Sequence, residues 1–179
     1  MFNGPISSIH WEKLSNLVHL QLNDNLLEGS IPSSLFSLPL LPELVLSDNQ
    51  FSVSICNGGL RVLDLSNNSL SGMILQCLST KAIIGALNLR RNNLTRTISN
   101  FEFPEYCELD TLNLGEDHIE GQFPKSLANC TGLQVLNLGK NHLADAFPCL
   151  LKNISTLRVL VLQSNKFYGR NECPKTNGT

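Results

Sequence analysis

Six cysteines are the side chains of this 179-residue chain with the clearest chemical potential, which is to form disulfides. An even number of cysteines fits a framework of bridges, although the count leaves the pairing open. Cysteine is also a common small core residue, so free buried thiols are the alternative. The C-x-x-C spacing of zinc sites and redox motifs does not occur. We therefore expect no metal site.

Five Asn-x-Ser/Thr sequons could carry N-linked glycans, as surface loops of secreted proteins do. They begin at Asn67, Asn93, Asn129, Asn153 and Asn177. Together with the even number of cysteines, the sequons favour a secretory origin.

Histidines and carboxylates give no sign of catalysis. His118 and His142 directly follow Asp117 and Asn141. Two adjacent imidazoles could sense pH or hold a metal, but two exposed loop histidines are the simpler interpretation. The motifs G-x-S-x-G, H-E-x-x-H and G-x-x-x-x-G-K-[ST] do not occur. We expect no catalytic residue, no cofactor and no enzymatic activity.

The bulk composition excludes two classes of partner. The net charge of −2 indicates neither nucleic acid nor an anionic membrane surface. No apolar run approaches the roughly 20 residues that span a bilayer, so we expect no membrane segment in this chain. The first residues, through Lys13, have neither the basic nor the apolar region of a signal peptide. The chain is then either a cytosolic protein or a piece of a longer secreted one.

One pattern accounts for most of the sequence. The stretch from Leu133 to Phe147 follows L-x-x-L-x-L-x-x-N-x-L-x-x-x-F, and six other stretches repeat it. The repeats start near residues 17, 41, 60, 84, 109, 133 and 157. This is the signature of a leucine-rich repeat, in which a short strand is followed by a turn held by a buried asparagine.

Successive repeat starts lie 24, 19, 24, 25, 24 and 24 residues apart. The second repeat is short by about five residues near positions 54–60, where either the turn is tight or material has been lost relative to a longer parent. We expect a single leucine-rich repeat domain over residues 1–179, with both end caps missing. Without caps, both ends of such a stack expose apolar surface.

The spacing of the leucines predicts the fold. Leu136 and Leu138 are two residues apart, so both point to the core side of a strand. We predict an α/β-type leucine-rich repeat solenoid: a right-handed curved coil of about seven repeats, with a parallel sheet on its concave face and mostly loops and 3-10 turns on its convex face. Asp117 replaces the turn asparagine. A carboxylate cannot donate as an amide does, so we expect a weaker turn or a shifted pKa there.

The repeat position of each cysteine and sequon narrows its role. Cys149 and Cys173 follow Asn141 and Asn165 by the same eight residues, so they should lie on adjacent layers within disulfide reach. The same nearest-layer reasoning pairs Cys107 with Cys130 and leaves Cys56 with Cys77. Asn129 and Asn153 occupy one repeat position, where a turn should face solvent.

The outward strand positions predict a binding face, because solenoids bind partners on their concave surface. Arg90, Arg91, Glu116 and Lys140 should cluster over three adjacent layers. A solvated face with exposed ion pairs is the alternative interpretation. The candidate ligand-binding residues are Asp64, Asn88, Arg90, Arg91, Asn113, Glu116, Asn137 and Lys140.

The consensus L-x-x-L-x-L-x-x-N-x-L-x-G-x-I-P, seen almost fully from Leu17 to Pro32, resembles the plant extracellular subtype of the repeat. In that subtype the G-x-I-P segment forms a second short strand. Blocks such as LDLSNNSLSG, SLANCTGLQVLNLGKN and FPCLLKNISTLRVLVLQSNKF look like plant receptor-like proteins of the Verticillium wilt resistance type.

The resemblance implies a function and a place in the cell. The chain would be a ligand-recognition and protein-interaction module from the ectodomain of a cell-surface immune receptor-like protein, on the extracellular face of the plasma membrane. Its partners would be an extracellular peptide or protein ligand and the ectodomain of a co-receptor kinase. The chain would be a truncated or internally deleted member. The alternatives are a soluble protein resembling polygalacturonase inhibitors and a non-functional receptor fragment.

Overall fold

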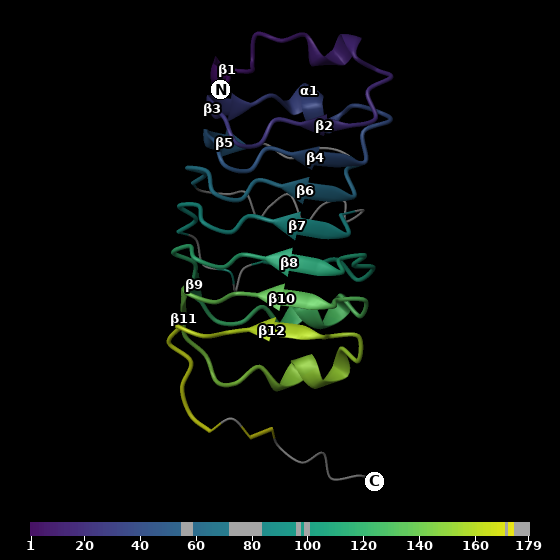
Figure 1. Ribbon diagram of the computed structural model, residues 1–179. Helices are drawn as coiled ribbons and strands as arrows, with labels where there is room; N and C mark the ends of the chain where they lie inside the picture. The colour runs from purple at the N-terminus through teal and green to yellow at the C-terminus, as the bar shows by residue number, and fades with distance from the viewer. Residues whose placement is uncertain (55–58, 72–83, 96–97, 99–100, 171, 174–179) are drawn as a thin grey trace.

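A seven-stranded parallel sheet forms one side of the molecule (Figure 1). The computed structural model describes residues 1–54, 59–71, 84–95, 98, 101–170 and 172–173. Each strand of the sheet comes from one repeat, and the strands follow one another in chain order. They are β2 (Leu20–Gln21), β4 (Glu43–Val45), β6 (Val62–Asp64), β7 (Ala86–Asn88), β8 (Thr111–Asn113), β10 (Val135–Asn137) and β12 (Val159–Val161).

The register of this sheet follows the leucine pattern. Leu112 at the centre of β8 pairs with Leu87 on one side and Leu136 on the other. These central leucines are buried, whereas the residues that flank them in each strand are half-buried. The inner layers of the sheet therefore keep their leucines inside and their alternate positions outside, whereas Leu160 in the last strand, β12, is exposed. The structure confirms the predicted leucine-rich repeat solenoid with its parallel sheet.

A second set of short strands lies beside the first sheet. β1 (Asn3–Pro5), β3 (Leu26–Ile31) and β5 (Gln50–Ser54) form a three-stranded parallel sheet, and β9 (Glu120–Gly121) pairs with β11 (His142–Leu143). These strands include the G-x-I segment of the first repeat, because Gly29 and Ile31 lie in β3. The second strand that the resemblance implies is thus present. The short spacing of the second repeat falls mostly on residues 55–58, outside the described residues.

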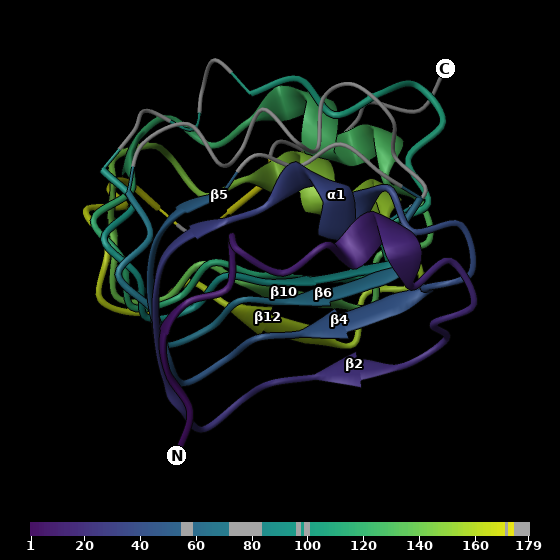
Figure 2. The ribbon, with the colours of Figure 1, turned by 90° about the horizontal axis from the view of Figure 1, so that it is seen from above.

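Short helical turns cover the side opposite the seven-stranded sheet (Figure 2). They are η1 (Trp11–Lys13), α1 (Ser33–Phe36), η3 (Lys125–Asn129) and η4 (Cys149–Asn153). Pro32, Pro124 and Pro148 stand directly before α1, η3 and η4, with φ of −67°, −70° and −75°. Proline sets this dihedral in advance, which favours a turn at the same point of each layer. Among the described residues no helix is long and apolar enough to cross a bilayer.

Side-chain amides connect each layer to the one before it. The Nδ2 group of Asn141 donates to the carbonyl oxygens of Leu138 in its own layer, at 3.1 Å, and Leu114 in the preceding layer, at 2.7 Å. Its Oδ1 atom accepts a hydrogen bond from the backbone N–H of Ile119 at 2.9 Å. Asn49 and Asn92 are also buried and repeat this arrangement. We call this series of side chains the asparagine ladder.

The residue before each ladder position has a left-handed backbone conformation. In the described part of the chain, seven residues that are not glycine have φ between 52° and 61°, a region that costs an L-residue roughly 1 kcal/mol. The turn imposes this conformation, because the ladder amide fixes the backbone on both sides of it. These residues are Asp24, Asp48, Asn67, Arg91, Glu116, Lys140 and Ser164.

We predict that Asn141→Ala destabilises the fold by roughly 2–3 kcal/mol, because the substitution leaves a buried N–H and two carbonyl groups without their partners. Urea unfolding followed by circular dichroism measures the change. Asn23→Ala is the matched control, since the Asn23 side chain donates only to exposed Asp24. Its effect should stay within about 0.5 kcal/mol. Equal losses in the two variants would contradict a structural role for the ladder.

Candidate ligand-binding site

A row of polar side chains crosses the outer face of the seven-stranded sheet. Asp64, Asn88, Asn113 and Asn137 are in register on β6, β7, β8 and β10 and are half-buried. The Nδ2 group of Asn88 donates to the Asp64 carboxylate at 3.1 Å. Asn137 Oδ1 accepts from the N–H of Gly139 at 3.0 Å. The row therefore presents ordered hydrogen-bond donors and acceptors at positions where the sequence predicts ligand binding.

Glu116 is the centre of a charged cluster at the end of these strands. Its carboxylate contacts Arg90 at the guanidinium, with the Nε atom at 2.8 Å, and Lys140 Nζ at 3.2 Å. Arg91 Nε lies 3.3 Å from the Oε2 atom of Glu116, which is also the oxygen that Lys140 contacts. The hydrogen bond from Arg90 is the main reason that the pKa of Glu116 falls to about 2, and those from Lys140 and Arg91 add to it. The structure thus brings together all four predicted members of the cluster.

A hollow of about 160 Å³ opens beside this cluster. A Cβ atom on Gly139 would lie 2.9 Å from a methyl group of Val161, and one on Gly115 would lie 2.9 Å from the amide of Asn137. Glycine at these two stacked positions therefore allows the next layer to approach closely. The residues that line the hollow are Arg90, Glu116, Asn137, Gly139, Lys140, Val161 and Gln163.

The candidate residues predicted from the sequence do not include Gly139, Val161 or Gln163, which also line the hollow. The repetition of glycine at one repeat position, in Gly115 and Gly139, is the sequence signal for this hollow. Three cations surround a single carboxylate here. The surplus positive charge suits the hollow to an anionic or hydrogen-bonding group of a ligand.

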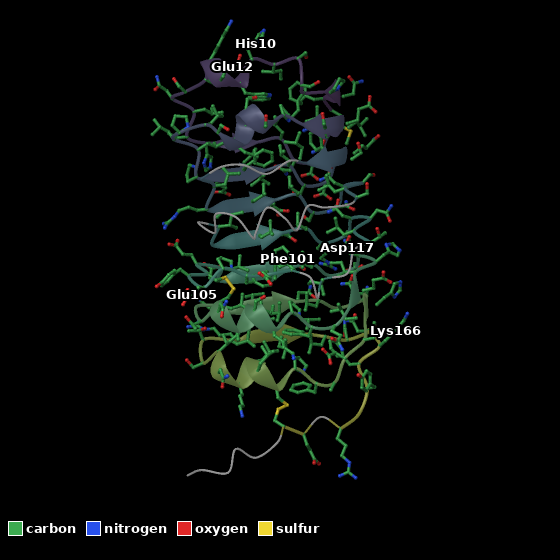
Figure 3. All side chains as sticks on the ribbon, turned by 180° about the vertical axis from the view of Figure 1, so that it is seen from behind. His10, Glu12, Phe101, Glu105, Asp117 and Lys166 are labelled. Atoms are coloured by element: carbon green, nitrogen blue, oxygen red, sulfur yellow. A yellow bond between two sulfur atoms is a disulfide. The ribbon has the colours of Figure 1, made fainter. Side chains whose placement is uncertain are left out.

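Asp117 interrupts the asparagine ladder directly after Glu116. Its side chain is 5% exposed, and its Oδ1 atom accepts from the N–H groups of Asn92, at 3.0 Å, and Leu94, at 3.1 Å. Among the described residues its Oδ2 atom has no hydrogen-bond partner, although it is buried. Asp117 is labelled in Figure 3. Burial raises the pKa of Asp117 to about 7, although the two backbone hydrogen bonds oppose the change. The shifted pKa expected from the sequence is therefore present.

His118 and His142 lie on one edge of the stack, as their repeat positions predict. Their rings make an edge-to-face contact with centroids 5.9 Å apart, and both residues are exposed. Among the described residues no group of three or more His, Cys, Asp or Glu side chains could hold a metal ion.

Two disulfides link neighbouring layers on the side of the helical turns (Figure 3). Cys107 is bonded to Cys130 and Cys149 to Cys173, with Cα atoms 4.6 and 5.4 Å apart. The predicted Cys56–Cys77 pair lies outside the described residues.

Four of the five sequons lie in the described part of the chain, and their asparagines are exposed: Asn67, Asn93, Asn129 and Asn153. Asn129 and Asn153 are the last residues of η3 and η4, so they lie on the turn side rather than on the sheet face. Asn177 lies outside the described residues. Glycans at the two turn positions would leave the polar row uncovered.

Comparison with known proteins agrees with this architecture. The Leucine Rich Repeat family model matches residues 16–38 and 59–80. The chain is 39% identical to Arabidopsis thaliana Receptor-like protein 41 over 138 residues, which is 74% of this chain and 16% of the relative. It is 36% identical to Receptor-like protein 35 of the same plant over 144 residues, again 74% of this chain and 15% of the relative. The chain thus spans about one sixth of the length of these curated relatives.

Solved structures of plant receptor ectodomains have the same fold. The ectodomain of the Arabidopsis receptor kinase HAESA, in complex with an N-terminally extended IDA peptide hormone, superposes with a TM-score of 0.79 and 31% identity. That match covers 93% of this chain and 28% of the ectodomain chain. The ectodomain of GASSHO1/SCHENGEN3 from Arabidopsis thaliana, in complex with CASPARIAN STRIP INTEGRITY FACTOR 2, gives 0.75 and 26%, covering 92% and 20%.

The chain is a leucine-rich repeat solenoid with the fold of plant receptor ectodomains. Its repeats match the Leucine Rich Repeat family model, and its sequence is similar to a part of Arabidopsis receptor-like proteins. Ectodomains with this architecture are in general binding modules rather than enzymes.

We predict that the stability of the fold depends on pH through Asp117. The folded state holds the Asp117 proton up to about pH 7, whereas an unfolded aspartate releases it near its ordinary pKa of 3.8. The free energy of unfolding should therefore fall as pH rises from about 4 to about 7 and then stay level. Asp117→Asn should remove this dependence and stabilise the fold above pH 7 by roughly 1–3 kcal/mol, because an amide can donate where the carboxylate cannot.

Urea unfolding between pH 5 and pH 8 measures this effect as the difference between the Asp117→Asn variant and the wild type. Asp110→Asn is the control, because Asp110 is exposed. Its unfolding curve should follow the wild type at every pH. If Asp117→Asn also ran parallel to the wild type, the buried carboxyl would not be the titrating group.

Proposed function

We propose that this chain is a ligand-recognition segment of the extracellular domain of a plant cell-surface receptor-like protein, of the immune type that confers Verticillium wilt resistance. The main support for this proposal is the polar row on the sheet face, which ends at the charged hollow beside Glu116. The row supplies directional hydrogen bonds and the hollow supplies a place for one ligand side chain. We assign peptide or protein binding to this surface.

The comparisons support the class of ligand. The HAESA and GASSHO1/SCHENGEN3 ectodomains are described in complex with a peptide hormone and with CASPARIAN STRIP INTEGRITY FACTOR 2. A further HAESA structure, 26% identical with a TM-score of 0.66, contains both the peptide hormone IDA and the co-receptor SERK1. By analogy, we propose that the receptor to which this chain belongs binds an extracellular peptide and engages a co-receptor kinase ectodomain.

The proposed location is the extracellular face of the plasma membrane. The two disulfides and the four exposed sequons fit an extracellular environment. The resemblance of the SLANCTGLQVLNLGKN and FPCLLKNISTLRVLVLQSNKF blocks to the Verticillium wilt type supports the finer assignment.

The proposal predicts that the sheet face is where peptides bind. We expect that peptides selected from a random display library against the immobilised chain bind at the hollow. Gln163→Arg should then weaken binding of most selected peptides by about tenfold, because the longer side chain fills the hollow that Gln163 lines, and this loss of room outweighs the attraction of the added charge for an anionic ligand group. Fluorescence anisotropy with labelled peptides measures the affinities.

Gln122→Arg is the matched control for this experiment. Gln122 is equally exposed but directly follows β9, which is not part of the seven-stranded sheet. Peptide affinity should be unchanged in this variant. Loss of binding in Gln122→Arg but not in Gln163→Arg would place recognition elsewhere and refute the proposal for the sheet face.

A further inference from the structure

The first three layers of the sheet face are acidic. Four positions in each layer lie on the outer side of the sheet: the residues on either side of the central strand leucine, and the second and third residues after the strand. In the layers of β2, β4 and β6 these positions hold four carboxylates and no lysine or arginine. The carboxylates are Asp24, Glu43, Asp48 and Asp64.

These four carboxylates have no cationic partner within salt-bridge distance in the described part of the chain. Neutral groups bind three of them instead. Asn23 donates to Asp24 at 2.6 Å, and Asn67 donates to Asp48 at 2.5 Å. The hydroxyl of Ser66 donates to Asp64 at 2.7 Å. The acidic half of the face therefore keeps its full negative charge.

The next layers carry the opposite charge. The layers of β7, β8 and β10 hold Arg90, Arg91 and Lys140 at the same outward positions, with Glu116 as their one carboxylate. Glu116 stays ionised and neutralises a single positive charge. The basic half therefore has a surplus of two positive charges, and the hollow opens beside it. Although the whole chain has a net charge of only −2, its sheet face is divided into two oppositely charged halves.

We propose that the sheet face binds an extended partner segment whose charges are segregated, with basic side chains over the layers of β2, β4 and β6 and acidic side chains over those of β7, β8 and β10. This inference rests on the proposed function and adds the charge pattern of the ligand. A uniform polyanion would be repelled by the first half and a uniform polycation by the second. The face thus selects the order of charges and not the net charge of the ligand.

The layer spacing sets the length of the segment. The centres of the two halves are three layers apart, which is about 14 Å at a strand separation of about 4.8 Å. An extended chain covers that distance in about four residues at roughly 3.4 Å per residue. A segment of about seven residues, with a basic group of three and an acidic group of three, matches both halves at once.

The test uses two synthetic peptides of identical composition. The segregated probe is Lys-Lys-Lys-Ser-Asp-Asp-Asp, and the alternating probe is Lys-Asp-Lys-Ser-Asp-Lys-Asp. Fluorescence anisotropy at low salt should show at least about fivefold tighter binding of the segregated probe. The difference should shrink as the salt concentration rises to about 0.5 M, because exposed charges are screened.

Charge-neutralising variants assign the two halves. The double variant Asp24→Asn and Asp48→Asn should weaken binding of the segregated probe by about fivefold, and asparagine tolerates the left-handed backbone at both positions. Lys140→Gln should weaken it by about threefold. The control is the double variant Glu102→Gln and Glu105→Gln, which removes two exposed carboxylates of the fourth repeat that are not at outward strand positions. This control should bind as the wild type does.

Three results would overturn the inference. One is equal affinity for the two probes, another is an equal effect of the face and control variants, and the third is binding of neither probe. Equal affinity for both probes, with loss of both in Gln163→Arg, would leave the proposed function intact while refuting charge selection. Failure of library peptides to bind would instead refute the proposed function, and the two failures are thus distinct.

Discussion

The side-chain amide that bonds to the backbone of two consecutive layers is the interaction on which this structure depends. A strand of three residues makes too few hydrogen bonds to hold a layer by itself, and the chain must turn sharply after each strand. Asn141 meets both needs, because it satisfies carbonyl groups of its own layer and of the layer before. The leucines supply the buried area, but the amides set the spacing and orientation at which the leucines meet. Every outward side chain inherits its position from this arrangement.

The periodic part of the structure could be predicted because its leucines and turn residues recur at nearly regular intervals in the sequence. The two-residue spacing of Leu136 and Leu138 was enough to predict the parallel sheet, and the absence of a donor at Asp117 predicted either a weaker turn or the shifted pKa that is found. The left-handed conformation of residues such as Arg91 could not be predicted from the sequence. The residues at that position of the repeats are not glycine, and they are not of one type. The tertiary hydrogen bonds of the turn impose it against local preference.

The candidate site shows the same division between what spacing reveals and what packing decides. The repeat positions predicted that four charged residues cluster, and in the structure three of them form ion pairs with the fourth, Glu116. The cluster is Arg90, Arg91, Glu116 and Lys140. The spacing of the repeats did not reveal the hollow. The shape of the hollow depends on how closely Val161 packs against Gly139, which has no Cβ atom. The candidate residues predicted from the sequence also included only Asp64 among the four acidic positions of the face. Their common lack of a cationic partner is a property of the folded surface, which only the contacts can show.

The left-handed turn has a consequence for how this surface can diversify. Because aspartate, asparagine, arginine, glutamate, lysine and serine all adopt the same backbone at that position, exchanging one for another changes the chemistry of the face without moving its frame. Duplication or loss of one whole repeat would shift every later side chain along the stack by one layer. Ligand recognition could then change in two separate ways, by a substitution at one turn position or by a change in the number of repeats.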